Sequence, residues 1–313
     1  MARNKVTVVG SYNVGLFLKG AAFPKPGETM IGSEFKEGGG GKGSNQALAA
    51  ARLGAEVSFI GRIGNDEYGR YALGLYGEFG ISTDSIKIDP ETHSGISVIL
   101  IDDTGSNMIM VVPGANFRLS REDIDRAEGI FRESFVVGFQ LESNFEIVEY
   151  GIRKAAASGA RVLLDPAPVR PLPPGLFRDI WCIKPNEHEA SAISGIEVVD
   201  YESAVEAGRW FVGKGVTVAL ITLGSQGAVL VTRDEAAGFP APAVDAVDTT
   251  GAGDCFSGAF MAGLASGMDL HRAIEYANCA ASISVTRLGV IESIPTAEEA
   301  RALFEGFARE ARA

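Results

Sequence analysis

Short apolar runs rich in β-branched residues alternate with Ala- and Leu-rich helical patterns along most of the chain. Residues 6–9 and 57–60 each predict a buried strand, and residues 44–53 between them predict a helix that ends at Gly54. This alternation is typical of βαβ units, in which helices cover a parallel sheet. It continues with predicted helices at residues 70–79, 147–157 and 201–214, and with predicted strands at 135–139, 161–164, 181–184 and 216–222. The chain from Gly253 onward is predicted to be mostly helical.

Two segments break this pattern. Residues 13–37 and 94–112 predict strands and turns with no helix between them, and the second segment predicts a hairpin that turns at residues 103–105. We therefore expect a three-layer α/β body with a mostly parallel central sheet, plus a small antiparallel β-lid. The body would comprise residues 1–12, 38–93 and 113–313, and the lid residues 13–37 and 94–112. The alternative is that both segments extend the main sheet.

Composition limits the partners of the chain. The 313 residues carry a formal net charge of −12, and no basic patch suited to nucleic acid is visible. The three cysteines form no CxxC pair, so neither a disulfide framework nor a zinc site is indicated. The sequence shows neither a signal peptide nor a long apolar stretch. We expect a cytoplasmic protein that binds neither nucleic acid nor membrane.

The run DTTGAGD at residues 248–254 leads directly into a small-residue, apolar helical pattern. Gly251, Ala252 and Gly253 would then lie at a helix N-terminus, where unpaired N–H groups and the helix dipole favour an anion such as a phosphoryl group. Asp254 beside that site suits a general base that takes a proton from an attacking hydroxyl. The alternative is that Asp254 only caps the helix.

The glycine-rich run GGGGKGSN at residues 38–45 also precedes a predicted helix. It is not a Walker A loop, because Gly43 rather than Ser or Thr follows Lys42. It matches GxGxxG, but the next strand ends in Gly61 and Arg62 rather than in the acid that a dinucleotide fold requires. Close backbone approach with Lys and Asn donors suits a polyol. A glycine-rich surface turn is the alternative.

Two further segments follow predicted strands. In KPNEHE at residues 184–189, Asn186 and Glu189 could position Mg²⁺ and its waters, or could form a capping box, and both can hold together. TLGSQG at residues 222–227 could contact a nucleotide, although alone it indicates little.

Taken in order, these motifs resemble the ribokinase family of carbohydrate kinases. The resemblance covers the chain from residues 9–13 to residues 286–289, and its two signatures are the stretches at 40–45 and 248–254. It implies a ribokinase-like fold, phosphoryl transfer from ATP to a sugar hydroxyl, Mg²⁺, a monovalent cation such as K⁺, and a homodimer formed through the lid.

The resemblance also implies roles for matching positions. Asp254 would be the base, with Gly251, Ala252 and Gly253 as the anion hole. The sugar would be bound by Asn13, Gly41, Lys42, Asn45, Glu142 and Asp254. ATP would be bound by Asn186, Thr222, Gly224, Gly227, Gly253 and Asn278, with Glu189 holding Mg²⁺ through water. The monovalent cation would be held at Asp248, Thr250, Ser284, Arg287, Gly289 and Ser293, several of them through backbone oxygens.

The chain departs from the family pattern at Gly15, where the family has an Asp that holds sugar hydroxyls. Losing a partner for buried hydroxyls typically costs on the order of 1–3 kcal/mol. The expected reaction is phosphorylation of a primary hydroxyl of a pentose, with ribose as the default acceptor. The alternatives are another acceptor (a ketohexose, a deoxypentose or a nucleoside), a dinucleotide-dependent oxidoreductase, and a non-catalytic sugar-binding protein.

Overall fold

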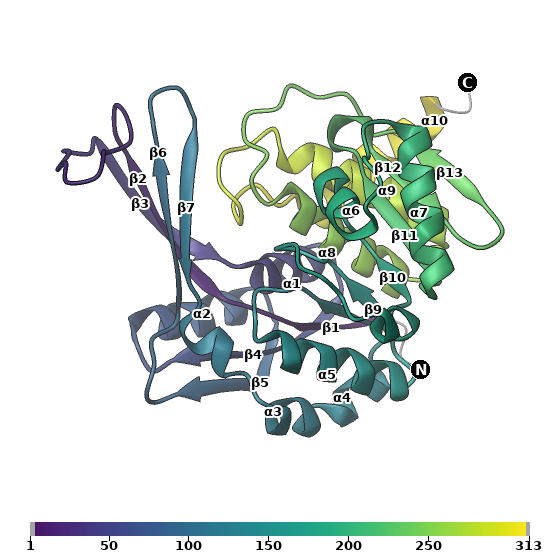
Figure 1. Cartoon of the computed structure of the whole chain (residues 1–313), viewed down its shortest axis with the longest axis horizontal. Helices are drawn as coiled ribbons and strands as arrows, with labels where there is room; N and C mark the ends of the chain where they lie inside the picture. Colours follow the sequence, from purple (N-terminus) through teal and green to yellow (C-terminus); the bar gives the residue numbers. More distant parts are fainter. Residues whose placement is uncertain (1–3, 311–313) are drawn as a thin grey trace.

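The computed structural model describes residues 4–310 and contains two sheets. The larger sheet has nine strands in the order β13-β12-β11-β10-β9-β8-β1-β4-β5 (Figure 1). All neighbours from β11 to β5 pair in parallel, whereas β12 and β13 continue the sheet in antiparallel fashion. The strands are β1 (Lys5–Val9), β4 (Glu56–Gly64), β5 (Ser82–Asp89), β8 (Val136–Phe139), β9 (Arg161–Leu164), β10 (Cys182–Ile183), β11 (Val218–Thr222), β12 (Ala228–Val231) and β13 (Ala236–Phe239).

Helices cover both faces of this sheet. The α-helices are α1 (Lys42–Arg52), α2 (Glu67–Glu78), α3 (Arg121–Arg126), α4 (Glu128–Glu133), α5 (Phe145–Ala157), α6 (Glu187–Ser194), α7 (Tyr201–Lys214), α8 (Ala252–Ala265), α9 (Leu270–Ser284) and α10 (Ala297–Glu310). Short 3₁₀ turns lie at η1 (Gly114–Arg118), η2 (Pro174–Asp179) and η3 (Gly224–Gln226). Because side chains alternate along a strand, Val8 joins a core with α1, α2, α8 and α9, and Val9 joins a second core with α3, α5 and α7. The expected three layers are confirmed.

The smaller sheet, which we call the lid, stands away from the body in Figure 1. It has the order β3-β2-β6-β7, from β2 (Asn13–Lys19), β3 (Glu34–Gly40), β6 (Gly95–Ile101) and β7 (Asn107–Val112). The two outer pairs are antiparallel, as expected, but the central β2–β6 pair is parallel. The reason is that β2 and β6 follow β1 and β5, which run in the same direction in the main sheet.

The expected alternation of strands and helices is confirmed, and the differences lie at edges. The sequence did not predict the antiparallel strands β12 and β13, and β10 is shorter than the expected strand at 181–184. The run of glycines is not a loop, since Gly38, Gly39 and Gly40 pair with Gly15, Val14 and Asn13 in the lid. The lid strand β3 therefore continues three residues past the expected boundary at residue 37. The division into body and lid as separate units stays a prediction.

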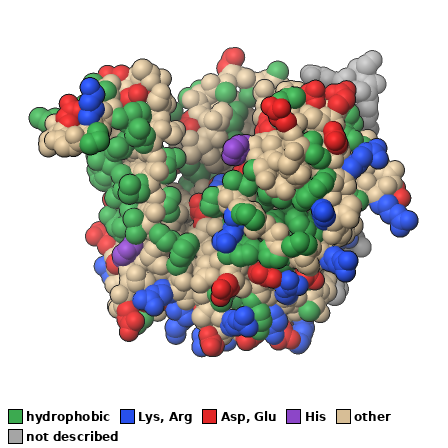
Figure 2. All heavy atoms as spheres, viewed as in Figure 1, with side chains coloured by type: hydrophobic (Ala, Val, Ile, Leu, Met, Phe, Trp, Pro, Cys, Tyr) green, Lys and Arg blue, Asp and Glu red, His purple; other side chains and the backbone are tan. Residues whose placement is uncertain are grey.

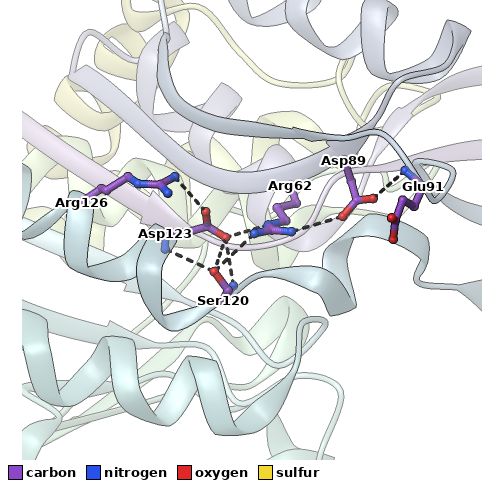
Figure 3. A network of polar contacts seen from close by, with 6 residues as sticks. All are labelled: Arg62, Asp89, Glu91, Ser120, Asp123 and Arg126. Atoms are coloured by element: carbon purple, nitrogen blue, oxygen red, sulfur yellow. Dashed lines mark hydrogen bonds and ion pairs between the residues drawn. The ribbon is translucent and has the colours of Figure 1, made fainter.

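Arg62 of β4 joins the end of β5 to α3 (Figure 3). Its guanidinium lies 2.7 Å from Asp123 and 3.2 Å from Asp89, the last residue of β5. The backbone N–H of Glu91 also donates to Asp89, and with Arg62 it holds the pKa of that carboxyl below its usual range. The chain segment that leads into β6 is thus anchored by an ion pair that is largely shielded from solvent.

Each helix within residues 4–310 is too short or too polar to traverse a lipid bilayer.

Candidate active site

The site centres on the start of α8. Gly251 adopts φ 78° as the N-cap, a left-handed conformation that favours glycine, and its missing Cβ leaves room for Val290. The N–H of Ala252 is turned back to the carbonyl of Thr249, whereas first-turn amides such as that of Gly253 have no acceptor within the helix. Asp254, in the same turn, is only 5% exposed. A carboxylate and an anion-binding helix terminus therefore lie side by side.

Helix α1 supplies two amide donors to Asp254. Asn45 Nδ2 lies 2.9 Å from Oδ2, and Gln46 Nε2 lies 3.1 Å from Oδ1. Each carboxylate oxygen thus accepts one hydrogen bond from a neutral group, and the orientation of the carboxylate is fixed. The sequence predicted Asn45 in the site but not Gln46.

A buried polar chain continues from Gln46 under the site. Gln46 Nε2 also donates to Asp165 at 2.9 Å, and its Oε1 accepts from Gln140 at 2.6 Å. Lys184 lies 3.4 Å from Asp165, and both side chains are 3% exposed. The ammonium of Lys184 is 3.7 Å from where a Cβ on Gly253 would be, which places a buried cation beside the first turn of α8. Sequence reasoning missed Gln140, Asp165 and Lys184, although Lys184 begins the KPNEHE motif.

Lys42 and Glu142 meet at the first turn of α1. Glu142 Oε2 accepts from the backbone N–H of Lys42 at 2.9 Å and from the hydroxyl of Ser11 at 2.6 Å. The negative charge of Asp254 is the largest cause that raises the pKa of Lys42, which therefore stays charged. These expected sugar-site residues are brought together with Asp254.

Asn13 and Gly41 close the same end of the site. Asn13 is buried, and its Oδ1 accepts from Nδ2 of Asn116 at 2.9 Å. Asn116 also bonds the backbone of Tyr12 through both ends of its amide, and sequence reasoning missed it. Gly41 has φ 89°, and a Cβ there would lie 2.8 Å from the backbone nitrogen of Asn13. Only glycine fits this position.

The expected nucleotide-side residues lie at the neighbouring strand ends. Asn186 and Glu189 form the capping box of α6, and Asn186 also pairs with Thr222, the last residue of β11. A Cβ on Gly227 would lie 2.0 Å from the carbonyl of Phe239, which in turn accepts from Nδ2 of Asn278 at 2.9 Å. Gly224, with φ 52°, begins the η3 turn between Thr222 and Gly227. These residues therefore converge on one edge of the sheet.

The expected cation residues lie in two loops that touch each other. The carboxylate of Asp248 accepts from the backbone N–H of Thr250 at 2.9 Å and of Gly289 at 3.1 Å. Burial raises the pKa of Asp248, but these hydrogen bonds outweigh it and hold the pKa below its usual value. The hydroxyls of Ser284 and Ser293 bond to nearby backbone carbonyls. The side chain of Arg287 turns away to Glu299, so only its backbone oxygen is left for an ion.

The candidate site is built without a cluster of metal-ligating side chains and lies apart from the cavity described below. Within residues 4–310, no three His, Cys, Asp or Glu side chains cluster so as to hold a metal ion. A cavity of about 590 Å³ opens at the opposite edge of the sheet, lined by residues such as Arg161 and Trp181, and none of the residues described above lines it.

A buried carboxylate beside a helix N-terminus, with a buried lysine next to both, suits a phosphotransferase that acts on an alcohol group. The comparisons agree, since the model of the "pfkB family carbohydrate kinase" matches residues 3–297. The chain belongs to this family of carbohydrate kinases. The oxidoreductase alternative is therefore wrong. Of the glycines that suggested it, Gly38 and Gly40 pair with β2 as residues of β3, and Gly43 lies in α1.

Several relatives are similar to the chain over nearly its whole length. The ribokinase of Haemophilus influenzae is 38% identical over 297 residues, which cover 95% of this chain and 97% of the relative. The deoxyribokinase of Salmonella typhi is 37% identical, with 94% and 96% covered. Among solved structures, Arabidopsis thaliana ribokinase with ribose and ATP superposes with a TM-score of 0.90 at 30% identity, covering 97% of this chain and 99% of that one.

Proposed function

We propose that this protein transfers the γ-phosphoryl group of ATP to a primary hydroxyl of a pentose, with ribose as the default acceptor. The observation that carries the proposal is the buried Asp254 carboxylate, held by Asn45 and Gln46 at the N-terminus of α8. The names of the relatives support ATP as donor and ribose as acceptor, because both appear in the Arabidopsis complex.

In this reaction Asp254 takes the proton of the acceptor hydroxyl as its oxygen attacks the γ-phosphorus. The bond between that phosphorus and the bridging oxygen breaks, and ADP leaves. The first-turn amides of α8 and the nearby ammonium of Lys184 stabilise the charge on the transferred group. Lys42, charged beside Asp254, orients the acceptor.

Two metal ions fit the residues present. Glu189 is partly buried, burial is the largest cause that raises its pKa, and the neighbouring carboxylate of Asp165 adds to the effect, so this edge of the site favours a cation. Mg²⁺ usually keeps waters and binds through few protein carboxylates together with substrate phosphates, which matches Asn186 and Glu189. Bound there, Mg²⁺ would neutralise phosphate charge.

A monovalent cation such as K⁺ suits the loops around Asp248 and Gly289. The atoms that could coordinate a cation there are all oxygens, from carboxylate, hydroxyl and backbone carbonyl groups, and hard cations prefer oxygen ligands. The residues that would hold it are Asp248, Thr250, Ser284, Arg287, Gly289 and Ser293. Because Gly251 packs on Val290, an ion in these loops would support the anion hole.

The lid supports a homodimer. Leu18, Phe35, Met108 and Met110 share its outer face by strand alternation and register, and Phe35 and Met110 are 64% and 71% exposed. Figure 2 shows apolar side chains gathered over the lid strands. We propose that a second copy of this chain covers this face. Exposed apolar patches and unpaired sheet edges are both surfaces at which protein chains associate. The three buried free thiols are typical of the cytoplasm, where we place the enzyme.

The test is ADP release measured with a panel of acceptors, each with and without K⁺. The panel contains ribose, 2-deoxyribose, fructose and adenosine. We expect the highest kcat/KM with a pentose and a lower rate when K⁺ is replaced by a bulky organic cation. A best rate with fructose or adenosine would transfer the proposal to a ketohexose or nucleoside kinase.

A further inference from the structure

The inner face of the lid carries Asn13, Gly15 and Phe17, which alternate along β2 and so point the same way. Asn13 joins the body through Asn116. The inner face therefore looks toward the candidate active site.

Lys36 gives a second indication of this direction. Lys36 in β3 is the register partner of Phe17 in β2. Its ammonium lies 3.4 Å from the carboxylate of Glu292, in the loop that also contains Gly289. The wall formed by Gly15 and Phe17 thus lies on the face of the lid that turns toward the loop of Gly289 and Glu292.

The ring of Phe17 occupies the space beside Gly15. A Cβ built on Gly15 would lie 2.8 Å from Cε2 and 3.2 Å from Cζ of that ring, closer than side chains pack. Gly38, the register partner of Gly15 across β3, also lacks a side chain and has open space beside it. A polar side chain at position 15 could hydrogen-bond a sugar hydroxyl. Here the wall consists instead of the edge of the Phe17 ring and the backbone of Gly15 and Gly38.

We infer that Gly15 and Phe17 together make the lid unable to recognise one ring hydroxyl of the acceptor, so that a pentose and its deoxy analogue are phosphorylated with similar efficiency. This inference rests on the proposed function. The physical basis is an asymmetry in recognition. A site that hydrogen-bonds a hydroxyl strongly rejects the analogue that lacks it, because buried polar groups are left unpaired, whereas an apolar wall discriminates weakly.

One neighbour on this wall does carry a hydroxyl. Ser97 is the register partner of Gly15 in β6 and is partly buried. A neutral hydroxyl can donate to or accept from water in place of the sugar, so we assign it no share in the selectivity. The experiment below tests this assignment directly.

The first measurement is the ratio of kcat/KM for ribose to that for 2-deoxyribose in the unaltered protein. We expect the two values to agree within about tenfold. Turnover of ribose with a preference of about a hundredfold or more would overturn the inference while leaving the proposed function intact. Turnover of neither sugar would overturn both.

The second measurement is a double-mutant cycle. Gly15→Asp alone forces its side chain into the Phe17 ring, whereas Gly15→Asp with Phe17→Leu gives the new carboxylate room. The double variant is expected to raise the preference for ribose by about tenfold to a hundredfold, as a gained charge-assisted hydrogen bond would. Phe17→Leu alone should leave the ratio within a few-fold.

Ser97→Ala is the matched control from the same wall. Its ratio should stay within about threefold of the unaltered value, and a tenfold change would assign hydroxyl recognition to Ser97 and overturn the inference. A ratio of two sugars on one preparation does not depend on the fraction of folded enzyme, so partial misfolding of a variant leaves the result interpretable.

Discussion

Gln46 Nε2 donates to Asp254 Oδ1 at 3.1 Å, from the second turn of one buried helix to the first turn of another. The contact joins α1, which follows the lid, to α8, which begins at the anion site. Because Gln46 also holds Asp165, one amide group orients the proposed base and connects it to the buried cation Lys184.

Replacing Asp254 by Asn tests the base directly. The amide keeps the size of the side chain but cannot accept the proton, and its NH₂ group would oppose the donors on Asn45 and Gln46. We expect kcat to fall by about 10²–10⁴ with the KM for ATP little changed. Initial rates of ADP release measure both, and a kcat within threefold of the unaltered enzyme would remove Asp254 from the role of base.

Gln46→Leu tests whether this residue positions the base. It leaves Asp254 and Asp165 each without one amide donor, so we expect kcat to fall by about tenfold and stability to fall by about 1–3 kcal/mol. The matched control is Gln140→Leu, which breaks the same chain one link further from Asp254. It should cost comparable stability in urea unfolding, with kcat nearly retained. Equal losses of kcat in both variants would contradict a positioning role specific to Gln46.

Arg62→Met tests the ion pairs that anchor the end of β5 to α3. The change leaves the carboxylates of Asp89 and Asp123 without their cation, and breaking a buried pair in this way costs about 3 kcal/mol. Arg126 is the control, because it also approaches Asp123 but its side chain is 67% exposed. Arg126→Met should change the free energy of unfolding by less than about 1 kcal/mol. Similar values for the two variants would argue against the anchor.

Glu299 gives a prediction for pH. A hydrogen bond from Arg287 is the largest cause that lowers the pKa of Glu299 to about 2, from an ordinary value of 4.5. A lowered pKa means that the pair stabilises the fold fully above pH 4.5 and loses its effect as pH falls toward about 2. Because Glu299 is largely exposed, the effect is small. The stability difference between the unaltered protein and Glu299→Gln should therefore shrink as pH falls below 4.5, and chemical unfolding at several pH values measures it. A constant difference would contradict the pair.

Met110→Asp tests the proposed dimer. A charge at this exposed position on the outer face of the lid should convert a dimer into a monomer of 32.9 kDa, as judged by light scattering coupled to size-exclusion chromatography. Val199, which is 67% exposed on the body, provides the control Val199→Asp, and this variant should remain dimeric. A monomeric unaltered protein at micromolar concentration would exclude a stable dimer.

Local patterns were enough to predict much of the fold and the centre of the site. Periodicity identified most strands and helices, and the small-residue run after Asp254 correctly predicted α8. Gln46 was missed because its position in an Ala-rich helix resembles any buried turn, and its partners Asp254 and Asp165 are more than a hundred residues away. Such contacts depend on how helices pack, which local sequence does not encode.

The glycine run at residues 38–41 is a second feature that local sequence did not predict correctly. The four consecutive glycines were expected to form a loop that approaches a polyol, yet Gly38 and Gly40 are strand residues because Gly15 and Asn13 pair with them across the lid. The parallel pairing of β2 with β6 is likewise a consequence of where β1 and β5 lie in the main sheet. Pairing between distant segments decided both features.

Gly41 gives the lid a mechanical connection to the chemistry. It is the single residue between the last residue of β3 and the first residue of α1, and its backbone is wedged against Ser11 and Asn13. Any displacement of β3 would therefore be passed to the first turn of α1, which carries Asn45, a hydrogen-bond donor to Asp254. The lid and the proposed base are thus connected by one residue of backbone and one turn of helix.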